Sequence, residues 1–479
     1  MSGPYLSKDG RLEPGAAAEG ARGPVVMKFG GSSVANAERL KGVRALSERQ
    51  RGRGVLLVLS ALSGVTDALA RAGNLASQGE LAAARAELEA LAARHRSLAA
   101  ELLAEAGRER ELAALNARLE AEFISLSALI EGAALLRALP ERSRDRLMGT
   151  GELLSTAVYA AYAGVPWLDA RLALRTDGRH GKARPDQAST AELAKAIVAL
   201  LVGPGQIAVT QGYIGSDAEG HMTTLGRGGS DYSASILGAA ISAAEIQIWT
   251  DVEGVLSGDP RVVSGAEPVE VLGYDEAAEL AAFGAKVLHP ATILPAVERG
   301  IAVTVRNSMA PDGRLTTIAH GSGSGREVTA LASRGPVSVV TVRTPRMLGG
   351  IGFLSRIFDA FGRRGLSVDL VATSEVSVSA SVDEGAELDG LCAELSSFAE
   401  VQVLRDRALV AVVGERLANA PGVAGRAFSA LGDINVELIS MGAGAINLSF
   451  VVRKEDAAEA QRRLHAAFFP GLELGREAS

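Results

Sequence analysis

Short apolar runs, each followed by glycine and then by an amphipathic stretch, recur along the chain. The first such unit is GPVVMKFGGSSVANAERL at residues 23–40, and the second is GVLLVLSALSGVTDALARA at residues 54–72. The apolar run predicts a buried strand, the glycines predict a turn, and the helical spacing that follows predicts a helix. Two such units in succession predict an α/β domain with a mainly parallel sheet.

Strong helix formers dominate the next part of the chain. Residues 77–146 are rich in alanine, leucine, glutamate and arginine, and no proline occurs before Pro140. The segment predicts a helical insertion that covers the sheet. We interpret its charged positions as a solvated helix face rather than a partner site.

The strand pattern then resumes in four segments, in which an apolar run delivers polar residues at its carboxyl end. They are GVPWLDARLALRTD, QIAVTQGYIGSD, AEIQIWTDVEGVLSGDPR and IAVTVRNSM. Ligands bind at the carboxyl ends of strands in open α/β sheets, so these ends are the expected site.

A chain of 479 residues predicts two or three domains. Residues 320–336, HGSGSGREVTALASRGP, have the glycine- and serine-rich composition of a linker. After them an internal repeat begins, in which Phe358 corresponds to Phe428 and Val368 to Val436. Each copy predicts a strand, a glycine-containing loop, an amphipathic helix, a tight turn and two strand-like runs, so we expect two small α+β modules of one type.

Charge and cysteine content exclude several classes of protein. The net charge of -7 disfavours binding to nucleic acids or membrane surfaces, which require a basic excess. The single cysteine, Cys392, excludes an internal disulfide framework and is expected on the buried face of a helix.

Residues 1–23 lack a signal-peptide pattern and predict a mobile tail. No apolar run reaches the roughly 18 residues of a membrane span, and we expect a cytoplasmic protein.

Two glycine-rich loops suit anions. In VMKFGGSS, glycines after a strand allow backbone N–H groups to approach a phosphate, and Lys28 adds charge. Taken alone, however, this short motif favours a tight turn with a surface lysine. In TLGRGGSDYSASILGAA, the guanidinium of Arg227 suits a carboxylate or phosphate. Ser230 and Asp231 could instead cap the following helix.

Further polar residues follow later strands: Thr250, Asp251 and Arg261 in WTDVEGVLSGDPR, and Lys286 in FGAKVLHP. Neither the G-x-x-x-x-G-K-[ST] pattern nor a full G-x-G-x-x-G pattern is present. The six histidines do not cluster, so we predict no protein metal site. Phosphate is the ligand that these loops share.

Six motifs in order now carry a family resemblance: VMKFGGSSV, MGTGELLS, TQGYIGSD, TTLGRGGSDYSA, IWTDVEGVLSGDPRVV and FGAKVLHPAT. Together they resemble the aspartate kinases of the amino-acid kinase family, from about Val25 to about Phe469. The resemblance implies a three-layer fold with an eight-stranded, mainly parallel sheet, followed by two ferredoxin-like ACT modules. It implies these ranges: tail 1–23, catalytic domain 24–319 with insertion 77–146, linker 320–336, and ACT modules 337–400 and 401–479.

The resemblance also implies an activity and a site. ATP would phosphorylate the side-chain carboxylate of L-aspartate to 4-phospho-L-aspartate, the first step towards lysine, threonine and methionine, with Mg²⁺ carried by the nucleotide. The implied catalytic residues are Lys28, Asp231 and Lys286. The implied substrate residues are Thr66, Glu152, Arg227 and Ser230. The implied ATP residues are Lys28, Gly30, Gly31, Ser32, Thr250, Asp251, Leu256, Arg261, Lys286 and Val287, with Leu256 replacing the tyrosine of some relatives.

The C-terminal modules imply regulation. MLGGIGFLSRIF and SVDLVATSEVSVS resemble effector-binding segments of lysine-sensitive aspartate kinases, and the matching residues are Met347, Phe353, Leu354, Val368, Asp369, Ser374 and Glu375. Asp369 and Glu375 suit an ammonium group, or are exposed carboxylates at strand ends. Lysine is the expected effector, with threonine or a joint effect open. Because ACT modules pair across an interface, we expect a homodimer or higher oligomer.

Two alternatives are weighed against this interpretation. A kinase of the same fold acting on glutamate or acetylglutamate would not explain the ACT pair or the GTGELLS motif. A non-catalytic amino-acid sensor would be expected to have lost at least one of Lys28, Glu152, Arg227, Asp231 and Lys286, and all five are present.

Overall fold

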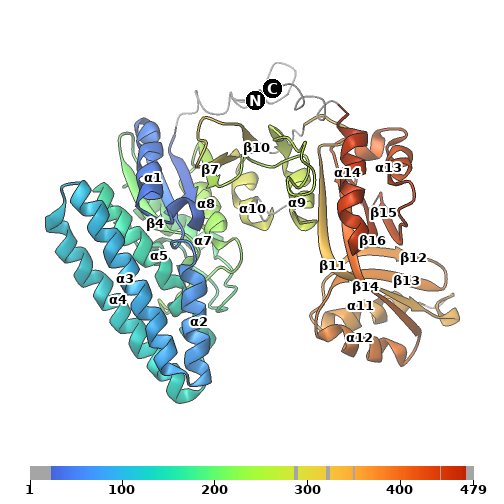
Figure 1. Cartoon of the computed structure of the whole chain (residues 1–479), viewed down its shortest axis with the longest axis horizontal. Coiled ribbons are helices and arrows are strands. Elements are labelled where there is room, and N and C mark those ends of the chain that lie inside the picture. The colour runs from blue at the N-terminus through green and yellow to red at the C-terminus, as the bar shows by residue number, and fades with distance from the viewer. Residues whose placement is uncertain (1–22, 285–289, 320–323, 349–350, 443, 471–479) are drawn as a thin grey trace. The chain divides into compact units, whose positions relative to one another are not determined.

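The computed structural model describes residues 23–284, 290–319, 324–348, 351–442 and 444–470 (Figure 1). The chain divides into two compact units, each of which is described by itself. The first comprises residues 1–254 and 288–320, and the second comprises residues 255–287 and 321–479. Residues 255–287, expected in the catalytic domain, therefore group with the C-terminal region, and most of the expected tail lies outside the described residues.

A mainly parallel sheet forms the centre of the first unit. Its strands in this unit lie in the order β3-β4-β2-β1-β7-β9-β10, parallel up to β9, with β10 antiparallel. Their bounds are β1 Val25–Phe29, β2 Val55–Leu59, β3 Trp167–Leu168, β4 Ile207–Gln211, β7 Glu245–Thr250, β9 Val303–Asn307 and β10 Leu315–Ala319. The chain moves from β1 to β2 in one direction and from β7 to β9 in the other, so the adjacent carboxyl ends of β1 and β7 form a switch point, where α/β sheets bind ligands.

Helices cover both faces of this sheet, and strand alternation decides which side chain meets which layer. Val25, Met27 and Phe29 belong to the core formed with the N-terminal helices. Val26 points to the other face: a Cβ added to Gly238 of α8 would lie 3.5 Å from Val26 Cγ2. Since side chains alternate along a strand, Lys28 shares the α8 face with Val26. The predicted three-layer α/β fold is confirmed.

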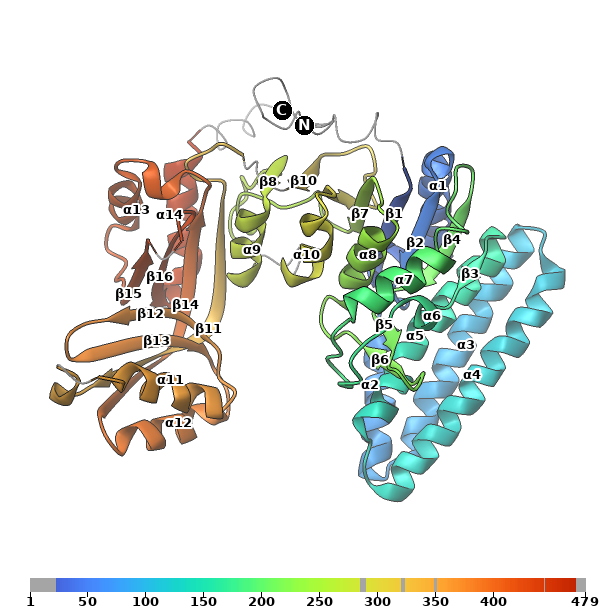
Figure 2. The ribbon, with the colours of Figure 1, turned by 180° about the vertical axis from the view of Figure 1, so that it is seen from behind.

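The remaining elements of the first unit are mostly helical. They are η1 Gly31–Val34, α1 Ala37–Gln50, η2 Arg51–Arg53, α2 Val65–Gln78, α3 Leu81–Glu105, α4 Glu109–Leu136, α5 Glu141–Ala163, α6 Ala170–Ala173, α7 Gln187–Ile197, β5 Ile214–Ser216, β6 Met222–Thr224, α8 Gly229–Ala240 and α10 Pro290–Glu298. Figure 2 shows the long α3 and α4 side by side, and they pack on α2 and α5. Both lie within the range 77–146, whose ends fall inside α2 and α5.

An antiparallel sheet of order β12-β13-β11-β14-β16-β15 forms the second unit. The elements of this unit are β8 Val271–Gly273, α9 Tyr274–Ala282, β11 Ala330–Arg343, η3 Pro345–Met347, α11 Phe353–Arg363, β12 Val368–Thr373, β13 Ser377–Asp383, α12 Glu387–Ser396, β14 Glu400–Val413, η4 Leu417–Asn419, α13 Val423–Leu431, β15 Leu438–Met441, β16 Asn447–Arg453, η5 Lys454–Asp456 and α14 Ala457–Phe468. The predicted repeat is confirmed, because Phe358 and Phe428 each pack against the core of their own module.

The long strands β11 and β14 change two expectations. Residues 330–336, expected in a linker, form the first half of β11, which pairs with the C-terminal half of β14. Gly335 and Pro336 are residue types typical of loops, but the strand continues past them with shifts in its register. The boundary between residues 400 and 401 likewise falls inside β14, because both modules share that strand.

None of the helices in the described ranges is both long enough and apolar enough to cross a membrane.

Candidate functional site

An ion pair marks the switch point of the first unit. Lys28 is near the end of β1, and its Nζ lies 2.6 Å from Oδ1 of Asp231 in the first turn of α8, with the side chains 12% and 14% exposed. The interpretation of Lys28 as a surface lysine in a tight turn is therefore wrong. The helix-cap alternative for Ser230 and Asp231 is also wrong, since Gly228 occupies the N-cap with a φ of 72°.

A pocket of about 460 Å³ is lined by residues close in sequence to this ion pair, but not by Lys28 or Asp231 themselves. It brings together five residues that the sequence predicts for the site: Gly31, Thr66, Glu152, Arg227 and Ser230. The other lining residues are Ser60, Ala61, Leu62, Ser63, Gly64, Asp67, Tyr213, Gly226 and Gly228. Gly31 follows β1 and Ser230 precedes Asp231, so the pocket and the ion pair share the loops that build them.

Glu152 supplies a buried carboxylate to the pocket. It lies on α5 and is only 3% exposed. Its Oε1 accepts a hydrogen bond of 3.3 Å from the Ala61 N–H, while its buried Oε2 receives none from another described residue. Burial raises the pKa of Glu152 to about 8, opposed by backbone N–H groups. A buried carboxylate with an unused oxygen at a pocket suits a cationic ligand.

Arg227 supplies the opposite charge. It is exposed at the tip of the loop between β6 and α8, and no described residue forms an ion pair with it. Gly226 and Gly228 flank it with φ values of 75° and 72°, a conformation that favours glycine. The pocket thus offers a carboxylate for an ammonium group and a guanidinium for a carboxylate, which are the two charged groups of an α-amino acid.

Ser60 and Tyr213 also line the pocket, and the sequence analysis missed both. The Oγ of Ser60 donates to Ser230 Oγ at 3.0 Å. Ser60 directly follows β2, and ligands bind at the carboxyl ends of such strands, so this position in the sequence could have indicated it. Tyr213 has a φ of 68°, which is strained for a bulky residue. Its N–H donates to Ser233 Oγ at 3.0 Å, and its carbonyl accepts from Leu225. No sequence pattern indicates this conformation.

The residues predicted to bind nucleotide divide between the two units. Gly30 and Thr250 lie at the adjacent ends of β1 and β7, where Gly30 N–H donates to the Trp249 carbonyl at 3.4 Å. Ser32 is in η1, and Thr250 Oγ1 donates to the exposed Asp251 at 3.1 Å. In the second unit, Leu256 forms a β-bridge with Pro268, and Arg261 makes two hydrogen bonds to the Asp259 carboxylate. Lys286 and Val287 lie outside the described residues.

The predicted effector residues differ in their surroundings. Met347, Phe353 and Val368 pack against the core of the first ACT module, and Leu354 is 43% exposed. Ser374 Oγ lies 2.7 Å from Ser377 Oγ, and Glu375 is exposed.

Asp369 is half-buried rather than an exposed strand-end carboxylate, so that alternative is wrong for this residue. Its Oδ2 lies 2.5 Å from Arg334 Nη2. Burial raises the pKa of Asp369, while Arg334 opposes that shift. An effector ammonium would have to share this carboxylate with Arg334.

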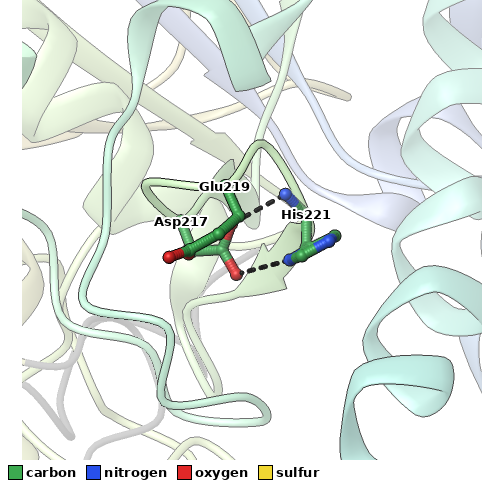
Figure 3. A group of neighbouring side chains, drawn as sticks. All are labelled: Asp217, Glu219 and His221. Atoms are coloured by element: carbon green, nitrogen blue, oxygen red, sulfur yellow. Dashed lines mark hydrogen bonds and ion pairs between the residues drawn. The ribbon is translucent and has the colours of Figure 1, made fainter.

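One group of possible metal ligands occurs among the described residues, in the turn between β5 and β6. Figure 3 shows Asp217, Glu219 and His221 there. The Asp217 carboxylate accepts from His221 N–H at 2.7 Å and lies 3.1 Å from its Nδ1. These contacts between Asp217 and His221 close the hairpin turn.

Comparison with known proteins agrees with this architecture. The amino acid kinase family model matches residues 23–307, and an ACT domain model matches residues 410–468. Lysine-sensitive aspartokinase 3 of Escherichia coli (strain K12) is 38% identical over 93% of this chain and 99% of that protein. Chloroplastic aspartokinase 1 of Arabidopsis thaliana is 36% identical over 94% of this chain and 81% of that protein.

Solved structures give the same result. Aspartokinase III of E. coli in complex with aspartate and ADP, in the R-state, has a TM-score of 0.81 at 36% identity, covering 93% of this chain and 99% of that one. The same enzyme with lysine and aspartate, in the T-state, has a TM-score of 0.76 at the same identity and coverage. This chain belongs to the amino acid kinase family and, within it, to the aspartokinases.

Proposed function

We propose that this protein transfers the γ-phosphoryl group of ATP to the side-chain carboxylate of L-aspartate, forming 4-phospho-L-aspartate and ADP. One observation carries the proposal: Glu152 and Arg227 line the same pocket, each with unused binding capacity, beside the Lys28–Asp231 ion pair. The homologous E. coli enzyme bound to aspartate and ADP supports this choice of substrates.

The pocket would orient aspartate by its α groups. The Glu152 carboxylate receives the ammonium group, and the Arg227 guanidinium receives the α-carboxylate. Thr66 and Ser230 line the same pocket as these two charged residues. The side-chain carboxylate is then directed towards Lys28.

Phosphoryl transfer needs no general base here, because a carboxylate is already ionised at neutral pH. One of its oxygens attacks the γ-phosphorus, a new O–P bond forms, and the bond to the β–γ bridging oxygen breaks, so that ADP leaves with that electron pair. The main obstacle is repulsion between two anions. Lys28 neutralises charge on the transferring group, and Asp231 holds the Lys28 ammonium in place.

The nucleotide would lie over the ends of β1 and β7. Gly30 and Gly31 bring backbone close to the phosphates, and the exposed Asp251 at the end of β7 suits a phosphate-bound cation. Mg²⁺ bound to the nucleotide supplies further neutralisation of phosphate charge. Thr250 at the end of β7 belongs to this proposed site. The other ATP residues that the family resemblance implies, Leu256, Arg261, Lys286 and Val287, stay a proposal from the sequence.

Residues 337–479 would regulate this activity, and residues 24–319 would carry most of the catalytic apparatus. We propose lysine as the effector, bound at the first ACT module near Asp369 and Glu375, in a homodimer or higher oligomer. The E. coli relative solved with lysine and aspartate supports that choice.

An acyl-phosphate assay tests this function. The full chain is incubated with ATP, Mg²⁺ and hydroxylamine, together with aspartate, glutamate or N-acetylglutamate, and the hydroxamate is measured. Aspartate should be the preferred substrate, because N-acetylglutamate has no ammonium group for Glu152 and glutamate has a longer side chain. Added lysine should lower the rate, and threonine should not. Equal or greater turnover of glutamate would contradict the substrate assignment.

A glycine substitution tests the packing of the pocket. In Gly212→Ala, the new Cβ would lie 2.6 Å from Ser230 Cβ and 2.8 Å from its Cα, so the first turn of α8 must move. We expect kcat/KM for aspartate to fall by roughly 100-fold, as small misplacements of reacting groups can cause.

The matched control is Gly42→Ala in the middle of α1, where the new Cβ meets no atom within 4 Å. This change should keep activity and stabilise the helix by about 0.5–1 kcal/mol. Steady-state kinetics and thermal unfolding of both variants give the comparison. Full activity of Gly212→Ala would show that Ser230 is not held as described.

A further inference from the structure

Asp145 is a buried carboxylate that the proposed chemistry does not use. It lies on α5 and is 1% exposed. Both of its oxygens lie 3.0 Å from the Gly181 N–H donor, Thr224 Oγ1 donates to Oδ1 at 2.5 Å, and His180 Nδ1 lies 2.8 Å from Oδ2. A buried carboxylate is costly unless its hydrogen bonds are satisfied, so these three partners explain how the site tolerates it.

These hydrogen bonds attach the loop of residues 178–184 and strand β6 to α5. Ala183 N–H also donates to the Thr224 carbonyl at 2.9 Å. The loop in turn supports the segment that carries Arg227: a Cβ added to Gly226 would lie 3.4 Å from the Gly181 carbonyl oxygen and 3.6 Å from Lys182 Cγ. Asp145 therefore holds the loop of residues 178–184 in place, and this loop supports the segment that carries Arg227.

The same helix carries Glu152, seven residues after Asp145. Seven residues are close to two helical turns, so both carboxylates lie on one face of α5, about 10 Å apart along its axis. One carboxylate faces the substrate pocket, and the other holds the loop beneath Arg227.

Hydrophobic packing contributes little to this anchor, because Ala183 is the only apolar side chain in residues 178–184, although it is buried. A second cavity of about 560 Å³ borders the loop, lined by Asp145, His180, Gly181, Lys182 and other residues, and Tyr213 lines both cavities. With open space on one side, the loop depends on hydrogen bonds for its position. Loss of the anchor should therefore move the loop without removing a core residue.

We propose that Asp145 is a positioning residue for amino-acid recognition, which fixes the separation between Glu152 and Arg227. This inference rests on the proposed function, because it assumes that those residues bind the ammonium and α-carboxylate groups of the substrate. Asp145 acts through Arg227 and does not touch the substrate.

Asp145→Asn tests the role, because the amide keeps the shape but can accept hydrogen bonds through only one atom. We expect KM for aspartate to rise by roughly 10-fold or more, the usual effect of losing hydrogen bonds to a charged group. The values of kcat and KM for ATP should change by less than about 3-fold, since the anchor acts on amino-acid binding alone.

The matched control is Asp177→Asn. Asp177 belongs to the neighbouring turn and accepts from Arg179 and Arg184 N–H groups, so it joins the loop to itself and not to α5. This variant should leave KM for aspartate within about 2-fold of the parent value. If KM for aspartate rose equally in Asp145→Asn and Asp177→Asn, the cause would be a general loosening of the loop. That result would overturn the proposal.

A double-variant cycle with Arg227→Ala separates positioning from a general structural role. If Asp145 acts through Arg227, adding Asp145→Asn to Arg227→Ala should raise KM for aspartate no further. Multiplied effects would contradict the proposal. If Asp145→Asn does not fold, His180→Ala is measured instead, because it removes one hydrogen-bond partner of Asp145 on its partly exposed side. We again expect KM for aspartate to rise and KM for ATP to change little.

Hydrogen exchange distinguishes failure of this inference from failure of the proposed function. Asp145→Asn should speed amide exchange in residues 225–228 whether or not the protein phosphorylates aspartate, and Asp177→Asn should not. Unchanged exchange in that segment would refute the anchor. Faster exchange in a protein that does not use aspartate would refute the proposed substrate instead.

Discussion

Lys28→Met is expected to lower kcat for aspartate phosphorylation by roughly 10²–10³-fold, the loss seen when one preorganised charge-stabilising group is removed. The Lys28 ammonium lies at the end of β1, beside the space where the phosphoryl group would transfer. Methionine has a similar length and no charge, so the packing against α8 should persist. The measurement is kcat and KM for both substrates, with thermal unfolding to check the fold.

Lys41→Met is the matched control. Lys41 lies on α1 of the same unit and forms an ion pair with Glu105 at the surface. Surface pairs contribute little, so this variant should keep nearly full activity. If Lys28→Met retained the turnover of the Lys41 control, the role assigned to Lys28 would be wrong.

Glu152→Gln is expected to raise KM for aspartate by roughly 100-fold near pH 8, because the ammonium group loses its buried counter-charge. The amide can still accept the hydrogen bond from Ala61 N–H, so the pocket should keep its shape. The matched variant is Glu122→Gln on the neighbouring α4, whose carboxylate binds Arg146 outside the pocket and should not affect KM.

The pH dependence of KM gives the sharper test of Glu152. Burial raises its pKa to about 8 in the empty pocket, so the carboxyl is mostly protonated below that pH. The substrate ammonium favours the ionised form, and binding should release a proton. KM for aspartate should therefore fall by about 10-fold per pH unit as the pH rises from about 6 to about 8, then level off. In Glu152→Gln it should be high and flat over this range, and an unchanged slope would contradict the assignment.

The sequence predicted the strands and loops of the site because local patterns determine them. The two glycine-rich loops indicated Lys28 and Arg227, and the ordered motifs indicated Glu152 and Asp231. The family that they indicated is confirmed. The contacts themselves depend on which face of β1 meets α8, and the sequence pattern alone did not specify that face.

Other features depend on tertiary packing and have no local signal. The strained backbone of Tyr213 is maintained by Ser233 and Leu225, and the anchor at Asp145 joins three segments that are distant in sequence. The strand β11 passes through Gly335 and Pro336, residues that normally end a strand, because β14 pairs with it on both sides of the irregularity. The composition therefore predicted a linker that ends at residue 336, whereas the strand begins at Ala330.

The position of phosphorylation on aspartate tests the proposed orientation most directly. The acyl phosphate formed from aspartate and ATP is reduced with borohydride, and the amino alcohol is identified. Phosphorylation of the side chain gives homoserine, and phosphorylation of the α-carboxylate gives 3-amino-4-hydroxybutanoate. Glu152 and Arg227 hold the α groups away from Lys28, so homoserine is the predicted product. If 3-amino-4-hydroxybutanoate were the main product, the proposed orientation would be wrong.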